Sequence, residues 1–295
     1  MVQKQFGSAD STGRKLNVIG EYLSMYQRAL SNTAFRTLYI DGFAGTGEVP
    51  LAEIKDDLLD EEVRTVIAGS ADRALKVDPP FGCYIFIDKR KDCIEALKAK
   101  FDDSQNAERA AYVVGDANEQ IQGICRAEQW RSQRGVVLLD PFGSQVHWET
   151  IEAIAATEAL DLWYLFPAGL SVFRQISSDG KVDPTHAPSL TRIYGPNKWQ
   201  SAFLKPSTQG DLFGDTVSHE KVVTPESAAQ FMIECLRSVF KGGVMDEMIP
   251  LGKHAYPSYY LLFAWGNASP KATALANRLS KAALKATDRK YGRIV

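Results

Sequence analysis

The chain has 295 residues, of which 45% are hydrophobic and 24% charged, so it is long enough for one large domain or two small ones with a sizeable core. Its 34 basic and 36 acidic side chains give a formal net charge of −2, which argues against a protein coated in positive charge to hold nucleic acid non-specifically. No apolar run approaches the roughly 18 residues of a membrane helix, and the N-terminal segment lacks the apolar core of a signal peptide. The four cysteines form no CxxC pair, so we expect no metal site and a cytoplasmic protein without membrane contact.

Apolar residues at helical spacing between Leu16 and Leu30 predict a first helix that covers one edge of the domain. Short and nearly continuous apolar runs follow, which are typical of parallel strands buried on both faces: 37–41, 83–88, 111–116, 135–140 and 161–166. Helical segments alternate with these strands, at about 70–76, 89–101, 118–131 and 148–157. The alternation predicts a doubly wound, mostly parallel α/β sheet.

Two further apolar runs, 244–251 and 258–265, are joined by a short segment and predict an antiparallel pair at the end of the sheet. Residues 48–68, rich in Asp and Glu, interrupt the alternation as a solvated acidic insertion. Residues 167–225, rich in Pro, Gly, Ser and Asp, form the longest irregular stretch. Because this stretch follows the fifth strand directly, we expect it to recognise a substrate or partner. No linker divides the chain, so 1–295 is expected to be a single domain.

Aspartates end four of the five parallel strands, at the edge of an open α/β sheet where ligands bind. The first strand runs into a glycine-rich turn that consists of Asp41, Gly42, Phe43, Ala44, Gly45, Thr46 and Gly47. Glycine permits a tight turn and a close approach to a ligand, although a plain tight turn is the alternative. The turn is neither a P-loop nor a complete GxGxxG. Ser70 begins the next helix, as its N-cap or beside a ligand carboxylate.

The second strand ends in Asp88, which is placed to accept hydrogen bonds from both hydroxyls of a ribose. The third strand runs into Gly115, Asp116 and Ala117, where a carboxylate and the neighbouring backbone could hold an adenine amino group. For both aspartates a helix N-cap is the alternative. Three such signals in order favour ligand binding over three unrelated turns.

These motifs resemble those of class I S-adenosylmethionine-dependent methyltransferases: DGFAGTG is similar to their first motif, Asp88 to their ribose-binding acid and GDA to their adenine-binding segment. The resemblance implies a Rossmann-like fold with an antiparallel C-terminal strand, an inserted segment after the fifth strand, and S-adenosylmethionine as cofactor. More closely, the whole chain resembles the three-Cys-motif partner protein (TcmP) family through YIDGFAGTG, GSADRAL, PPFGCYIFID, GDAN, YYLLFAWGN and the stretch from VVLLDPFGSQ to LWYLFPAG. That family is named for a genetic neighbour with three cysteines, which implies a radical-SAM-like protein as partner.

The fourth strand runs into the most distinctive site of the chain: Asp140, Pro141, Phe142 and Gly143, followed by His147 and Trp148. Amino-methyltransferases carry an [N/D]-P-P-[Y/F/W] loop here, whose polar side chain and proline carbonyl accept hydrogen bonds from the target amine. The resemblance implies Asp140, Pro141 and Phe142 as catalytic residues, although Phe142 replaces the second proline and Gly143 the aromatic residue. His147 and Trp148 are expected to bind substrate: Phe142 or Trp148 would stack on a base, and His147 would accept a proton, unless it is a surface or hydrogen-bonded histidine. The alternative is that Asp140 caps a helix or orders the turn, while Phe142 and Trp148 fill the core.

From Lys271 onward the chain has seven basic residues and one acidic residue, a local charge of +6, so the remainder carries −8. Within a helix, Leu275, Leu279 and Leu284 would face inward and leave Lys281 and Lys285 in solvent, as a solvated face or as a patch that follows phosphates.

The sequence therefore favours an S-adenosylmethionine-dependent methyltransferase that acts on an amino or ring nitrogen of a nucleic-acid base. One alternative is a non-catalytic methyltransferase-like partner of a three-cysteine-motif protein. A nicotinamide-dependent oxidoreductase is disfavoured because the glycine-rich turn lacks GxGxxG.

Overall fold

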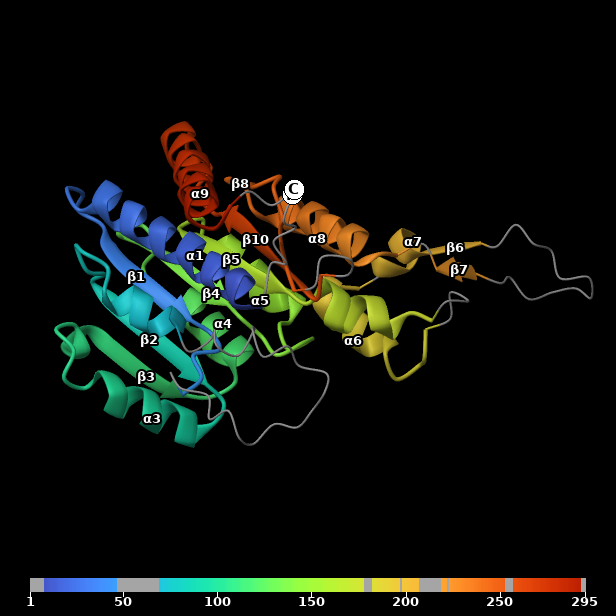
Figure 1. The fold of residues 1–295 in the computed structure, drawn as a ribbon, viewed down its shortest axis with the longest axis horizontal. Helices are drawn as coiled ribbons and strands as arrows, with labels where there is room; N and C mark the ends of the chain where they lie inside the picture. Colours follow the sequence, from blue (N-terminus) through green and yellow to red (C-terminus); the bar gives the residue numbers. More distant parts are fainter. Residues whose placement is uncertain are drawn as a thin grey trace, which may run out of the picture.

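A computed structural model describes residues 8–46, 69–177, 182–196, 198–206, 219–221, 223–252 and 257–292. Within these ranges one mixed sheet has the strand order β3-β2-β1-β4-β5-β10-β8, and β9 also pairs with β10 (Figure 1). Its strands are β1 (Arg36–Asp41), β2 (Cys83–Asp88), β3 (Ala110–Val114), β4 (Gln133–Leu139), β5 (Leu160–Phe166), β8 (Gly243–Val244), β9 (Ile249–Leu251) and β10 (Tyr259–Trp265). The first five run parallel, whereas β10 is antiparallel to β5, β8 and β9.

Helices cover both faces of this sheet (Figure 1). One face packs against α1 (Ser8–Leu30), a helix at 69–75, α3 (Lys91–Phe101) and α9 (Pro270–Tyr291). The opposite face packs against α4 (Ala117–Ala127), α5 (Trp148–Ala156), α6 (Ala187–Tyr194), α7 (Trp199–Phe203) and α8 (Pro225–Val239). Strands β1, β2, β4 and β5 bury side chains on both faces, which is why their sequences are nearly continuously apolar. The arrangement is the doubly wound, mostly parallel α/β architecture expected from the sequence, with an antiparallel strand, β10, beside β5.

The predicted strand at 244–251 differs from the expectation. The structure divides it into β8 and β9, which pair with opposite ends of β10. Between them Asp246 forms an exposed ion pair with Arg237 of α8, so the polar residues of this run leave the sheet. The acidic insertion predicted at 48–68 lies outside the described residues.

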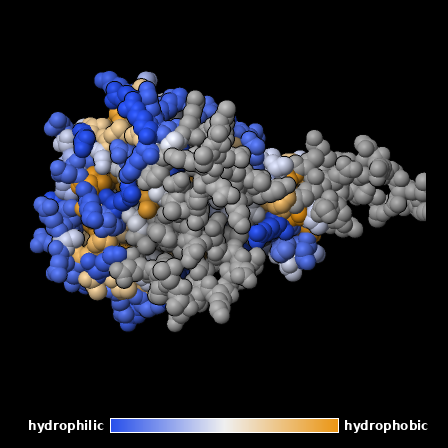
Figure 2. Space-filling model, in the orientation of Figure 1, coloured by the Kyte–Doolittle hydropathy of each residue, from blue (hydrophilic) through white to orange (hydrophobic). Residues whose placement is uncertain are grey.

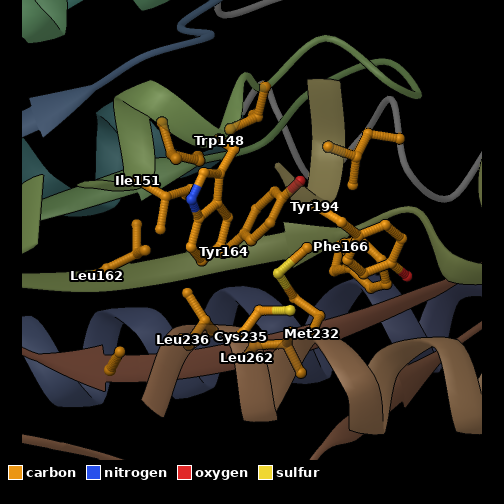
Figure 3. Close-up of a cluster of buried hydrophobic side chains, with 14 of the residues drawn as sticks. Trp148, Ile151, Leu162, Tyr164, Phe166, Tyr194, Met232, Cys235, Leu236 and Leu262 are labelled. Carbon is orange, nitrogen blue, oxygen red and sulfur yellow. The ribbon is translucent and has the colours of Figure 1, made fainter. Parts of the chain in front are cut away.

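The stretch after β5 has more structure than its composition suggested. A π-helix (Ala168–Val172) follows β5, and β6 (Leu204–Pro206) pairs with β7 (His219–Lys221) in a separate two-stranded sheet. Tyr194, Phe203 and Phe231 pack ring to ring, with centroids 5.2–5.4 Å apart. Their rings extend the main core, and Figure 3 shows Tyr194 beside Phe166 of β5. Tyr194, Trp199 and Phe203 of this stretch are therefore part of the core.

The C-terminal helix α9 agrees with its predicted faces. Leu279 is buried and Leu275 and Leu284 pack against the same core, while Lys281 and Lys285 are exposed. Figure 2 shows a hydrophilic surface at the upper left, where Figure 1 places α9. The apolar side of this helix therefore belongs to the core, and its basic side belongs to the surface.

Candidate functional site

The strand order reverses between β1 and β4, which lie side by side at the centre of the sheet. In open α/β sheets, ligands bind outside the carboxyl ends of the strands at such a switch point. Asp41 is the last residue of β1, Asp88 is the last residue of β2, and Asp140 follows β4 directly. Three carboxylates thus lie at three neighbouring strand ends.

Asp41 is fully buried and held from several sides. One carboxylate oxygen accepts hydrogen bonds from Ser70 Oγ at 2.8 Å and Tyr39 OH at 3.4 Å, and the other accepts from Phe43 N at 3.2 Å. Burial, together with the charge of nearby Asp140, raises the pKa of Asp41 to about 7, although the Ser70 hydroxyl opposes the shift. Ser70 lies inside the helix at 69–75, and its hydroxyl donates to Asp41, so it is not the N-cap of that helix.

The glycine-rich turn folds back over the end of β2. Gly45 has φ +61°, a conformation that glycine adopts without strain, and its N–H donates to Asp88 Oδ2 at 3.0 Å. Asp88 Oδ1 accepts from Arg90 N at 2.8 Å, so Asp88 orders this turn and does not cap α3. Ala44 is buried, and its N–H donates to Ile87 O at 2.9 Å. The predicted turn and the predicted ribose-binding acid are therefore in direct contact.

Gly42 and Gly47 are the other two glycines of the predicted turn. A Cβ at Gly42 would lie 3.0 Å from methyl groups of Ile121 and Leu139, so any larger residue would have to push these side chains aside. Gly47, expected to bind the cofactor, lies outside the described residues.

Asp116 is the N-cap of α4, which is the alternative that its sequence left open. Its Oδ1 accepts hydrogen bonds from Asn118 N at 2.9 Å and from Asn118 Nδ2 at 3.1 Å. Partial burial raises the pKa of Asp116, but the hydrogen bonds from Asn118 outweigh it and lower the net value. Ala117 is buried in the first turn of α4.

Asn118 links this turn to the loop after β4, a role that nothing in its sequence position signalled. Its Nδ2 donates to Gln145 O at 2.9 Å, and its Oδ1 accepts from His147 N and from Thr150 Oγ1, each at 2.9 Å. Within the same loop, Phe142 N donates to Gln145 Oε1 at 2.8 Å. These bonds fix the loop that lacks the second proline of the amino-methyltransferase pattern.

Lys15 is the second residue that the sequence did not indicate. It comes from α1, and its Nζ lies 2.8 Å from Asp140 Oδ2 with about 1% of each side chain exposed. Burial lowers the pKa of Lys15, while Asp140 and Asp41 raise it. Burial raises the pKa of Asp140, and Lys15 opposes that shift. Asp140 is therefore the anionic half of a buried ion pair rather than a helix cap, and His147 occupies the N-cap position of α5.

The remaining predicted residues differ in accessibility. Phe142 is 41% exposed, Pro141 is buried, and His147 is half-buried at the start of α5. Trp148 is only 2% exposed and lies among the buried side chains beside Ile151 (Figure 3). Its Nε1 donates to Glu152 Oε1 at 2.7 Å, and Lys198 Nζ lies 3.9 Å from its ring centroid. Trp148 is therefore part of the core in this structure, the alternative that its sequence left open, and its stacking on a base stays a prediction.

The described residues contain no group of three or more His, Cys, Asp or Glu side chains placed to hold a metal ion. None of the helices in the described ranges is long and apolar enough to cross a membrane.

No protein-family model matches the chain, so the resemblance to the TcmP family is not confirmed. No curated protein matches it either. Among solved structures, Trm1 from Pyrococcus horikoshii in complex with S-adenosyl-L-methionine is 14% identical, over 92% of this chain and 61% of that one, with a TM-score of 0.47. The chain thus spans less than two thirds of the length of that neighbour. The protein LPL1258 from Legionella pneumophila is 12% identical over 94% and 92% of the two chains, with a TM-score of 0.46.

A putative S-adenosylmethionine-dependent methyltransferase from Listeria monocytogenes is 11% identical, over 84% of this chain and 98% of that one, with a TM-score of 0.37. Identities of this size say nothing about the ligand or substrate of the present chain. Its site has to be interpreted from its own residues.

Proposed function

We propose that this protein is an S-adenosylmethionine-dependent methyltransferase that modifies an amino or ring nitrogen of a nucleic-acid base. The observation that carries the proposal is the meeting of Asp41, Asp88 and Asp140 at the switch point, with the Gly45 turn folded onto Asp88. S-adenosylmethionine would supply an electrophilic methyl group on a positively charged sulfur. A set of carboxylate acceptors suits a ligand that carries an ammonium group, a sulfonium centre and ribose hydroxyls.

Each residue has a definite task in this proposal. Asp41, whose oxygens keep lone pairs beyond those used by Ser70, Tyr39 and Phe43, would hold the ammonium group. Asp88 would accept from the ribose hydroxyls, again through lone pairs that Gly45 and Arg90 leave free. The backbone around Asp116 and Ala117 would bind the adenine, since the Asp116 carboxylate is already the cap of α4.

The loop after β4 would position the target nitrogen. Asp140 and the Pro141 carbonyl would accept its N–H groups, and the exposed ring of Phe142 would stack on the base. When bound, S-adenosylmethionine would supply the methyl group to this nitrogen, which would lose a proton on methylation. His147, half-buried beside this loop, is the candidate acceptor of that proton. Most of the rate enhancement would come from orientation.

A basic stripe on α9 supports a nucleic-acid substrate. It consists of the exposed residues Lys271, Arg278, Lys281, Lys285 and Arg289. The C-terminal half of α9 contacts the half of α1 that carries Lys15, because Asn17 Nδ2 donates to Thr287 Oγ1 at 3.1 Å. The stripe therefore leads toward the end of the molecule where Asp140 lies, and its cations would neutralise backbone phosphates.

Two observations favour a second candidate, a non-catalytic partner of a three-cysteine-motif protein. The ion pair with Lys15 occupies one oxygen of Asp140, and Gly143 stands where the amino-methyltransferase loop has its aromatic residue. In that case the chain would co-purify with a radical-SAM-like protein, and a cofactor would be structural or absent.

Titration calorimetry with S-adenosylmethionine and S-adenosylhomocysteine tests the enzyme proposal. We expect both to bind, and Asp88→Ala to weaken each by about tenfold to a hundredfold, because a carboxylate that accepts charge-assisted hydrogen bonds is removed. Asp92→Ala is the matched control, since Asp92 is an exposed aspartate close to the same turn that pairs with Arg90. If the unmodified protein binds neither compound, the enzyme proposal is wrong.

A further inference from the structure

Stability alone does not explain the buried ion pair between Lys15 and Asp140. Both side chains are about 1% exposed, and their charged atoms are 2.8 Å apart. Burying two charges costs desolvation energy that their mutual attraction repays only in part, so a pair of apolar side chains would serve packing at least as well. Lys76 and Asp72 form a pair of the same length on the surface, at 74% and 36% exposure, where no such cost arises.

Asp140 has an unusual second oxygen. Its Oδ2 binds Lys15, but Oδ1 is buried and accepts no hydrogen bond from any residue in the described ranges. Buried carboxylate oxygens normally have partners, and an open acceptor is costly. Asp140 lies at the end of β4, next to the strand that ends in Asp41, on the edge of the sheet where a ligand would bind.

We propose that Lys15 is a positioning residue for methyl transfer: it binds Asp140 Oδ2 and thereby presents Oδ1 as an ionised acceptor for an N–H of the target amine. The inference rests on the function proposed above. Lys15 touches neither substrate nor cofactor and acts through Asp140.

Two physical effects of Lys15 support this role. Its ammonium charge opposes the rise in the pKa of Asp140 that burial causes, and so favours the ionised carboxylate. Its hydrogen bond also fixes the plane of the carboxylate, so that Oδ1 has one position. A protonated or rotating Asp140 would be a weaker acceptor, since hydrogen bonds to a charged group are about twice as strong as those between neutral groups.

The affinities of two small molecules, S-adenosylhomocysteine and sinefungin, distinguish the proposed role of Lys15 from a general effect on cofactor binding. S-adenosylhomocysteine ends at a neutral thioether sulfur, whereas sinefungin carries a C–NH₃⁺ group where S-adenosylmethionine carries S⁺–CH₃. The ammonium of sinefungin can donate an N–H to Oδ1 in the way that a target amine would. The ratio of the two dissociation constants therefore reports on Oδ1 and cancels the shared nucleoside and amino-acid contacts.

Calorimetry with both compounds on the full chain, its Lys15→Met variant and a Lys76→Met control tests the proposal. We expect Lys15→Met to weaken sinefungin relative to S-adenosylhomocysteine by about tenfold or more, and Lys76→Met to leave the ratio within about twofold. Lys15→Gln keeps a side-chain N–H donor, one atom shorter than lysine and without the charge, and it replaces Lys15→Met if that variant does not fold by circular dichroism. We expect an intermediate ratio for Lys15→Gln, because the donor remains while the charge and some reach are lost.

The outcomes are distinct. If neither compound binds the unmodified protein, the methyltransferase proposal fails, and this inference fails with it. If both bind but the ratio does not change, or changes toward tighter sinefungin in Lys15→Met, Lys15 has only a structural role and the cofactor proposal survives. Asp140→Asn supplies the cross-check: it should remove the preference for sinefungin to the same extent as Lys15→Met.

Discussion

Replacing Asn118 by alanine should destabilise the protein more than its size suggests. The side chain is 5% exposed and makes hydrogen bonds with Asp116 Oδ1, Gln145 O, His147 N and Thr150 Oγ1. Asp116 keeps a hydrogen bond from the backbone N–H of residue 118, so that loss is small. The other three groups lose a partner at about 1 kcal/mol each, which gives a decrease of about 3 kcal/mol in the free energy of unfolding.

Urea unfolding followed by circular dichroism measures this difference, with Asn106→Ala as the matched control. Among the described residues, the half-buried Asn106 side chain makes a single hydrogen bond, from Nδ2 to Leu75 O at 2.8 Å. We expect about 1 kcal/mol for the control. If the two variants lose the same free energy, the hydrogen bonds of Asn118 do not hold the loop after β4 together, and our account of that loop is wrong.

Three further predictions concern the core and the sheet. Asp161→Asn should make the free energy of unfolding less dependent on pH. Burial raises the pKa of Asp161 from 3.8 to about 7, so between these values the native state binds a proton that the unfolded state lacks. In parallel denaturant titrations, the parent protein should therefore gain up to about 4 kcal/mol relative to the variant as pH falls from about 7 to 4. A parallel pH dependence in both proteins would show that Asp161 is not the titrating group. Trp148→Ala should cost about 3–5 kcal/mol in urea unfolding, and Phe142→Ala less than about 0.5, because one ring is buried and the other exposed; similar losses would contradict their placement. Gly169→Ala should lower stability by about 1–3 kcal/mol in thermal unfolding, since its Cβ would lie 2.2 Å from Pro257 O, and an unchanged melting temperature would refute that close approach.

The sheet could be predicted because its signals are local. Each of the first five strands is an apolar run that ends near a polar or glycine residue, and parallel strands joined by helices place Asp41 and Asp88 at one edge. The division of 244–251 into β8 and β9 could not, because it depends on how the two segments pair with opposite ends of β10. The π-helix after β5 likewise follows from tertiary contacts, since Gly169 N donates to Ser258 O at 3.0 Å.

The site was predictable only in part, for a related reason. Capping and stacking are both consistent with the residues around Asp116 and Trp148, and tertiary packing decided between them. Lys15 gave no signal: a lysine next to Leu16 in an amphipathic helix normally lies in solvent, and its partner Asp140 is 125 residues away.

Helix α1 makes two buried contacts of this kind with the sheet, and their difference locates the site. Lys15 and Tyr22 are seven residues apart, two turns of one helix face, and each meets an aspartate: Asp140 after β4 and Asp161 near the start of β5. Asp161 is satisfied by Tyr22 OH at 2.6 Å and by the backbone N–H of Gly266, as a structural carboxylate should be. Asp140 lies at the opposite, carboxyl end of the strands and keeps Oδ1 without a partner among the described residues. The same helix thus completes one carboxylate and leaves the other open at the edge of the sheet where a ligand would bind, which is the arrangement expected if Asp140 receives its last hydrogen bond from a substrate.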